Sequence, residues 1–232
     1  MNPDPNPKLV APLWHTAILL ILVLLNSVAS ARTHNLWRIA SLSADPQIAG
    51  YLTVILFEWL MVAYIWWGVR LRGATLSDLI RGSWPRWTTI LRDLAIAIAF
   101  FIVANIVYGT LARLLHVDPG ASLKQIMPRG PAETAVYLLL ALTAGFCEEL
   151  IFRGYLFRQF TVLGKSITAG LLLQGIVFGL AHGYQGPKLM LIVTVYGCLF
   201  GVLAAWQRSL RPGMIAHALQ DAIVVLLFRF MR

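Results

Sequence analysis

The sequence predicts an all-α protein, a polytopic bundle of about seven transmembrane helices. Two observations carry this prediction: the scarcity of charge and the spacing of the apolar segments. Of the 232 residues, 59% are hydrophobic and only 12% are charged, whereas soluble domains carry about 25% charged residues. The mean hydropathy is +0.73. A chain with so few charged groups cannot cover a water-facing surface, so we expect an integral multi-pass membrane protein.

Apolar segments recur along the whole chain and define the expected helices. A bilayer-spanning helix needs about 20 mostly apolar residues, and seven segments come close to this length: 12–31, 48–69, 90–115, 132–152, 166–183, 188–206 and 213–231. No hydrophilic stretch between them is long enough to form a soluble domain. We therefore expect one membrane domain, with N-terminal helices that carry no recognisable motif over 1–125 and a motif-bearing core over 126–232.

The basic residues are grouped between the apolar segments. The chain has 19 Lys and Arg against 10 Asp and Glu, but the cations form no continuous stripe of the kind that binds nucleic acid. Cations at membrane edges mark cytoplasmic loops. The densest group lies between the second and third segments, so we expect this loop and the N-terminus inside and the C-terminus outside; the group comprises Arg70, Arg72, Arg81, Arg86 and Arg92.

The first apolar segment is expected to remain as an anchor. It ends in Ala29-Ser30-Ala31, which is similar to a signal-peptide cleavage site. However, its apolar run is long, and Lys8 is the only cation ahead of it. We therefore predict a retained helix.

Several residues outside the motifs have expected structural places. Cys147 and Cys198 are expected to be small buried hydrophobes, and Asn105 and Gln174 to hydrogen-bond between helices. Histidines near helix ends are expected at the membrane interface: His15, His34 and His116. The same holds for tryptophans at these ends: Trp14, Trp37, Trp66, Trp67, Trp84 and Trp87.

Ionisable residues interrupt the apolar segments in the second half of the chain. Within a membrane such residues are costly and usually functional. Glu149 and Arg153 stand one helical turn apart and are the natural ion pair. Glu148 points about 100° away from Glu149 on an α-helix, so it has no ionic partner in its own helix. Ala144, one turn before Glu148, is small enough to leave room for a cavity beside this carboxylate.

Two further groups follow in the later segments. Phe178 and His182 share a helix face just before a break at Gly183–Pro187, and His217 and Asp221 are one turn apart in the last segment. If the fourth helix continues to about residue 161 and turns at Gly164-Lys165, antiparallel neighbours have numbers that add to about 330. Glu148 and His182 meet this condition, so we expect them at the same level.

Converging carboxylates and imidazoles inside a membrane have few chemical uses. One is hydrolysis, in which Glu148 takes a proton from water while the histidines and Asp221 assist. A second is a Zn²⁺ site formed by Glu148, His182, His217 and Asp221. A third is a proton pathway.

The three motifs, Glu148-Glu149-xxx-Arg153, Phe178-xxx-His182 and His217-xxx-Asp221, resemble those of the CAAX-protease and bacteriocin-processing (CPBP, or Abi) family of intramembrane endopeptidases. The resemblance covers about residues 130–230 and includes relatives of the type II CAAX prenyl proteases. It implies that Glu148 activates water and that His182 and His217 assist, with the residue at the Asp221 position helping to hold the oxyanion.

At that last position, family members that process prenylated substrates carry Asn. An ionised Asp221 would repel an oxyanion, so Asp221 is protonated, orients His217 or belongs to a metal-ligand set. Glu149 and Arg153 are expected to be structural, and Phe178 to shape the pocket.

The resemblance implies a peptidase acting on a membrane-anchored or peptide substrate in a bacterial plasma membrane. We favour glutamate catalysis without a cofactor over a zinc-dependent enzyme. A non-catalytic immunity or scaffold protein and a small proton-coupled transporter are the other hypotheses. Substrate identity, oligomeric state and the role of Glu58, a carboxylate among tryptophans in the second segment, stay open at this stage.

Overall fold

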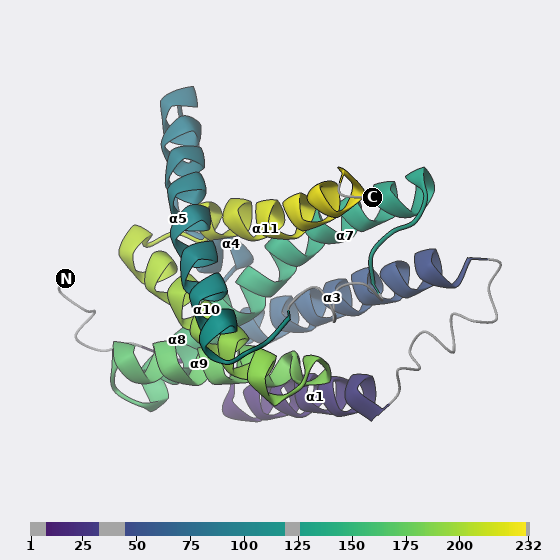
Figure 1. Cartoon of the computed structure of the whole chain (residues 1–232). Coiled ribbons are helices and arrows are strands. Elements are labelled where there is room, and N and C mark those ends of the chain that lie inside the picture. Colours follow the sequence, from purple (N-terminus) through teal and green to yellow (C-terminus); the bar gives the residue numbers. More distant parts are fainter. Residues whose placement is uncertain (1–7, 33–44, 119–125, 231–232) are drawn as a thin grey trace.

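The computed structural model describes residues 8–32, 45–118 and 126–230, and every regular element in these ranges is helical (Figure 1). The elements in chain order are α1 (Leu13–Arg32), α3 (Pro46–Arg70), α4 (Leu76–Ile80), α5 (Trp87–Leu114), α7 (Pro131–Glu148), η1 (Glu149–Leu156), α8 (Phe157–Leu163), α9 (Ile167–Ala181), η2 (Gly183–Gln185), α10 (Pro187–Gln207) and α11 (Arg211–Phe230). The predicted all-α bundle is confirmed. His34 and Trp37 lie outside the described residues.

Among the described residues, five helical segments are long and apolar enough to cross a membrane: 13–30, 46–70, 87–114, 131–163 and 187–207. The remaining two of the seven expected segments correspond to α9 and α11. α9 is shorter than these spans, and α11 carries the motif with His217. The protein is therefore an integral membrane protein built around these spans.

Helix starts follow ordinary capping chemistry. Asp45 caps α3 by accepting hydrogen bonds from the backbone N–H groups of Gln47 and Ile48. Proline occupies the first turn of α3, α7 and α10, where its missing N–H costs nothing. These signals explain why the observed helix starts lie within three residues of the expected ones.

The fourth span is one continuous helical rod that changes its winding in the middle. α7 passes without a break into η1, a π-helix, and then into α8, which ends before a turn at Gly164-Lys165. The predicted extension of this helix and its turn are therefore confirmed. The π-helix was not expected; such wider turns are rare and are found mostly at functional sites.

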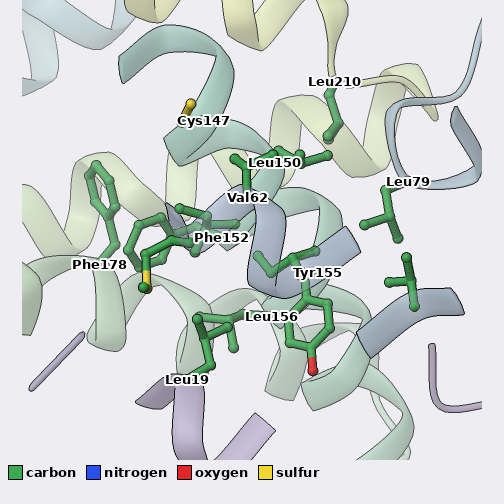
Figure 2. Close-up of a cluster of buried hydrophobic side chains, with 14 of the residues drawn as sticks. Leu19, Val62, Leu79, Cys147, Leu150, Phe152, Tyr155, Leu156, Phe178 and Leu210 are labelled. Carbon is green, nitrogen blue, oxygen red and sulfur yellow. The ribbon is translucent and has the colours of Figure 1, made fainter. Parts of the chain in front are cut away.

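The main hydrophobic core surrounds η1. All eight residues of η1 are buried, and its apolar side chains pack with those of α1, α3, α4 and α9 (Figure 2). Figure 2 shows Leu150, Phe152, Tyr155 and Leu156 of η1 at the centre of this cluster. The segment that carries the first motif is thus the most deeply packed part of the molecule.

The N-terminal helix is fixed to this core by polar contacts, which corrects the interfacial placement of His15. His15 is fully buried; its Nδ1 lies 2.8 Å from the Tyr155 hydroxyl, and its Nε2 lies 2.9 Å from the Tyr64 carbonyl. The prediction failed because position near a helix end does not reveal that another helix covers it. The exposed His116 and the five described tryptophans of the expected interfacial set do lie at the surface.

The loop between α3 and α5 folds back onto the ends of α8 and α11. The Arg158 guanidinium donates to the carbonyls of Asp78 and Leu79, and that of Arg211 donates to the carbonyl of Gly82. The basic loop, the end of the fourth span and the start of α11 therefore share one end of the molecule. This is the arrangement that alternate crossing of a membrane requires.

Candidate active site

The first motif lies at the junction of α7 and η1. The predicted ion pair is confirmed: Arg153 Nη1 donates to Glu149 Oε1 at 2.8 Å, and both side chains are almost fully buried. Arg153 Nη2 also donates to the Gly197 carbonyl of α10, and the guanidinium lies 4.2 Å from the centre of the Phe178 ring. Arg153 thus ties η1 to α9 and α10.

His217 joins this ion pair from α11. Its Nδ1 lies 3.0 Å from Glu149 Oε1, the same oxygen that accepts from Arg153. Because a carboxylate oxygen accepts, His217 Nδ1 donates, which fixes the ring orientation and directs Nε2 the other way. Glu149 was expected to be mainly structural; the structure shows that it also positions an imidazole.

The other ring nitrogen of His217 faces two carboxylates. His217 Nε2 lies 3.6 Å from Glu148 Oε2 and 3.9 Å from Asp221 Oδ2. These distances are too long for direct hydrogen bonds but short enough for electrostatic attraction. Glu148, His217 and Asp221 are therefore brought together as the motifs predict.

The members of this group differ in exposure. The side chains of Glu149 and His217 are 1% and 8% exposed, whereas those of Glu148 and Asp221 are 20% and 33% exposed. Glu148 and Asp221 thus form the accessible side of the group, and the Glu149–Arg153 pair forms its buried support. Water or a substrate would meet Glu148 and Asp221 first.

His182, from the second motif, lies directly after α9 as its C-terminal cap residue. Its Nδ1 lies 2.8 Å from the Phe178 carbonyl, so Nδ1 donates and Nε2 is left for other partners. The Phe178 ring contacts both imidazoles, with ring centres 4.7 Å from His182 and 6.2 Å from His217. Phe178 is buried, as expected for a residue that shapes the pocket wall.

The predicted level of His182 is supported by the packing of the hairpin. Phe152 and Phe178, whose residue numbers add to 330, pack edge to face with ring centres 4.9 Å apart. The register that places Glu148 opposite His182 is therefore observed one turn further along, at Phe152 and Phe178. The direct proximity of Glu148 and His182, and the cavity expected beside Glu148, stay predictions.

Close packing of α7 and α11 sets the distance between the first and third motifs. A Cβ atom on Gly145 would lie 2.7 Å from the backbone nitrogen of Ala218 and 2.8 Å from the carbonyl oxygen of Met214. Only glycine permits this approach, because both neighbours are backbone atoms of α11 and cannot turn aside. Gly145 thus brings His217 within reach of Glu149.

Replacing Gly145 with valine is therefore expected to lower the stability by about 1–3 kcal/mol, the usual cost of overpacking, and to lower any activity of the site. Thermal unfolding in detergent measures the first effect. Gly109→Val is the matched control, because a Cβ atom on Gly109 in α5 meets nothing within 4 Å. Equal melting temperatures for the two variants would contradict the proposed role of Gly145.

The polar residues expected to join helices do so. Gln174 Nε2 donates to the Gly197 carbonyl between α9 and α10, and Asn105 Nδ2 donates to Gln220 Oε1 between α5 and α11. Gln220 also accepts from the Tyr196 hydroxyl. Sequence reasoning missed Gln220, although a polar residue next to Asp221 in an apolar helix was a usable signal. It fixes α11 next to the third motif.

The expected zinc-ligand set is Glu148, His182, His217 and Asp221. In the parts of the chain that the structure describes, no three His, Cys, Asp or Glu residues are arranged to hold an ion. Both imidazole Nδ1 atoms donate to oxygen acceptors, so each ring could offer only its Nε2 atom to an ion. Binding of Zn²⁺ by this set, and catalysis without it, stay predictions.

Comparison with protein families places these motifs in a known context. Residues 130–223 match the Rce1-like family, described as type II CAAX prenyl endopeptidase Rce1-like. The matched region begins just before α7 and includes all three motifs, so the family resemblance inferred from them is confirmed for this region. Comparisons with curated proteins and with solved structures gave no match.

Proposed function

We propose that this membrane protein, whose residues 130–223 match the Rce1-like family, is an endopeptidase that hydrolyses a peptide bond of a membrane-associated substrate through glutamate-activated water. The family match implies a peptidase. The observation that carries the finer assignment is the position of His217, held by Glu149 on one side and facing the accessible carboxylates of Glu148 and Asp221 on the other.

Glu148 is the general base in this proposal. Its partly exposed carboxylate can accept a proton from a water molecule, and the resulting hydroxide attacks the substrate carbonyl. The proton is then delivered to the leaving amine, so that Glu148 ends the cycle as it began. Glu149 does not take this role, because its side chain is buried and its Oε1 already accepts from Arg153 and His217.

The imidazoles assist at the two ends of the reaction. His217 Nε2 faces outward beside Glu148, where an N–H in the protonated ring can stabilise the developing oxyanion. Asp221, 3.9 Å from this nitrogen, orients the ring and favours its protonated form in the transition state. His182 has its Nε2 left available by the Phe178 hydrogen bond, and it helps to deliver the proton taken from water to the leaving amine.

The test is cleavage by the purified protein reconstituted into vesicles. A panel of membrane-anchored peptides, including a prenylated peptide of the CAAX type named in the family description, is incubated with wild type and with His182→Ala. Mass spectrometry is expected to find two new fragments with wild type and a large loss with His182→Ala. Absence of cleavage by well-folded wild type across the panel would instead support a non-catalytic role.

Activity is expected to be independent of added metal. Because no three His, Cys, Asp or Glu residues in the described part of the chain are arranged to hold an ion, we propose catalysis without a metal cofactor. Treatment with a chelator should therefore change the cleavage rate by less than about twofold. A zinc-dependent enzyme would lose nearly all activity, because the metal activates its water. Loss of activity with chelator that Zn²⁺ restores would establish the zinc-dependent alternative.

A further inference from the structure

Glu58 is a buried carboxylate that the mechanism above does not use. It lies on α3, outside the region matched by the family, and is 6% exposed. Its Oε2 has no hydrogen-bond partner among the described residues. Burying a carboxylate without a partner is expensive, so a side chain held in this state needs a reason.

The packing of α3 on α7 places Glu58 beside the candidate active site. Tyr51 packs on Tyr137 and Trp59 packs on Phe146, with ring centres 5.2 and 5.7 Å apart. Both pairs advance in the same direction, so the two helices run parallel (Figure 1). Residues about 86 positions apart therefore lie at the same level.

This register puts Glu58 level with Ala144 or Gly145. Glu148 is three to four residues further along, about 5–6 Å along the axis. Glu58 is close enough for electrostatic interaction with both Glu148 and Asp221. The unpartnered carboxylate therefore lies on a neighbouring helix, within electrostatic reach of the carboxylates of the site.

With Glu58 included, the site has more acidic side chains than basic ones. Arg153 is paired with Glu149 and the Gly197 carbonyl. His217, and His182 at its expected level beside Glu148, can carry positive charge near the carboxylates. The acidic members are Glu58, Glu148, Glu149 and Asp221. If all four ionise, they outnumber the cations even when both imidazoles are protonated, and each unpaired charge is costly away from water.

A substrate can supply the missing cation. Asp221 and Glu148 are more exposed than the rest of the site, and Glu58 is buried. A lysine ammonium on its flexible four-carbon stem is long enough to reach a buried carboxylate. Trypsin selects basic residues with a buried carboxylate of this kind. Pairing with the substrate would offset the cost of keeping Glu58 unpaired.

We propose that Glu58 is a specificity-determining residue and that the preferred substrate carries a lysine or arginine within two residues of the scissile bond. This proposal rests on the proposed function, because it names the substrate class of the same site. It also assigns a role in substrate selection to α3, which lies outside the motif-bearing core.

The test compares matched substrates. A membrane-anchored peptide that wild type cleaves is altered at each of the two positions on either side of its scissile bond, with lysine or with norleucine, which has the same stem and no charge. At one of these positions, wild type is expected to show a kcat/KM for the lysine peptide at least about tenfold above that for the norleucine peptide, typical of a desolvated charge pair. In Glu58→Gln this ratio is expected to fall toward one.

Glu133→Gln is the matched control, since Glu133 lies at the start of α7, away from the site, and should keep the wild-type ratio. Glu58→Asp keeps the charge and should keep part of the preference if Glu58→Gln fails to fold. Equal cleavage of both peptides at every position by wild type, or an unchanged ratio in Glu58→Gln, would overturn the proposal while leaving the peptidase assignment intact. Failure of folded wild type to cleave any peptide would overturn the peptidase assignment itself.

Discussion

Replacing Glu148 with glutamine is expected to lower kcat for peptide cleavage by about 10²–10⁴-fold, the usual contribution of a general base. Glutamine keeps the size and hydrogen-bonding shape of the side chain but cannot take a proton from water. Because Glu148 is partly exposed and makes no hydrogen bond through Oε2 in the described structure, the melting temperature should change little. The measurement is initial cleavage rates at saturating substrate, with thermal unfolding in the same detergent.

Glu133→Gln serves as the matched control, because it removes a carboxylate from the opposite end of the same helix. It should keep both wild-type rate and stability. A Glu148→Gln variant that cleaves at the wild-type rate would show that another group activates the water.

Replacing Arg153 with methionine is expected to lower the stability by about 3–5 kcal/mol, the cost of leaving one member of a buried ion pair without its partner. Arg153 is 1% exposed and is the cation that neutralises Glu149. Methionine keeps the aliphatic stem but not the guanidinium, so the loss reports on the abandoned charge and hydrogen bonds and on the lost contacts with the Phe178 and Phe200 rings. Chemical or thermal unfolding in detergent measures it.

The double variant Glu149→Gln with Arg153→Met separates charge from packing. Neutralising both partners removes the uncompensated carboxylate, so the double variant should be more stable than Arg153→Met alone. A double variant as unstable as the sum of both single losses would show that the ion pair itself contributes little beyond packing. It should still lack activity, because His217 loses the carboxylate that orients it.

Helix positions and motif pairings were predictable because they depend on local patterns. Apolar runs of bilayer length bounded by proline and charge gave the spans to within a few residues. The Glu149–Arg153 pair follows from one-turn spacing, and the hairpin register followed from counting residues about the turn at Gly164-Lys165. In each case the partners lie on one helix or on consecutive helices.

Contacts between distant helices were not predictable in the same way. The contact of His217 with Glu149 joins residues 68 positions apart and depends on the close approach that Gly145 permits. The burial of His15 depends on its contacts with Tyr64 and Tyr155. The π-winding of η1 leaves no periodicity signal in a segment of only eight residues. Each of these features arises from tertiary packing, which a linear pattern does not encode.

The central claim is that Glu148 and His217 act as a unit on one substrate carbonyl: Glu148 activates the attacking water, and His217, held by Glu149, stabilises the oxyanion. A double-mutant cycle on kcat tests it most directly, using Glu148→Gln, His217→Asn and the combination, each checked for folding. Residues that act as a unit give strongly non-additive losses, so the account predicts that the double variant is no more than a few-fold slower than the slower single variant. Losses that multiply in the double variant would contradict it.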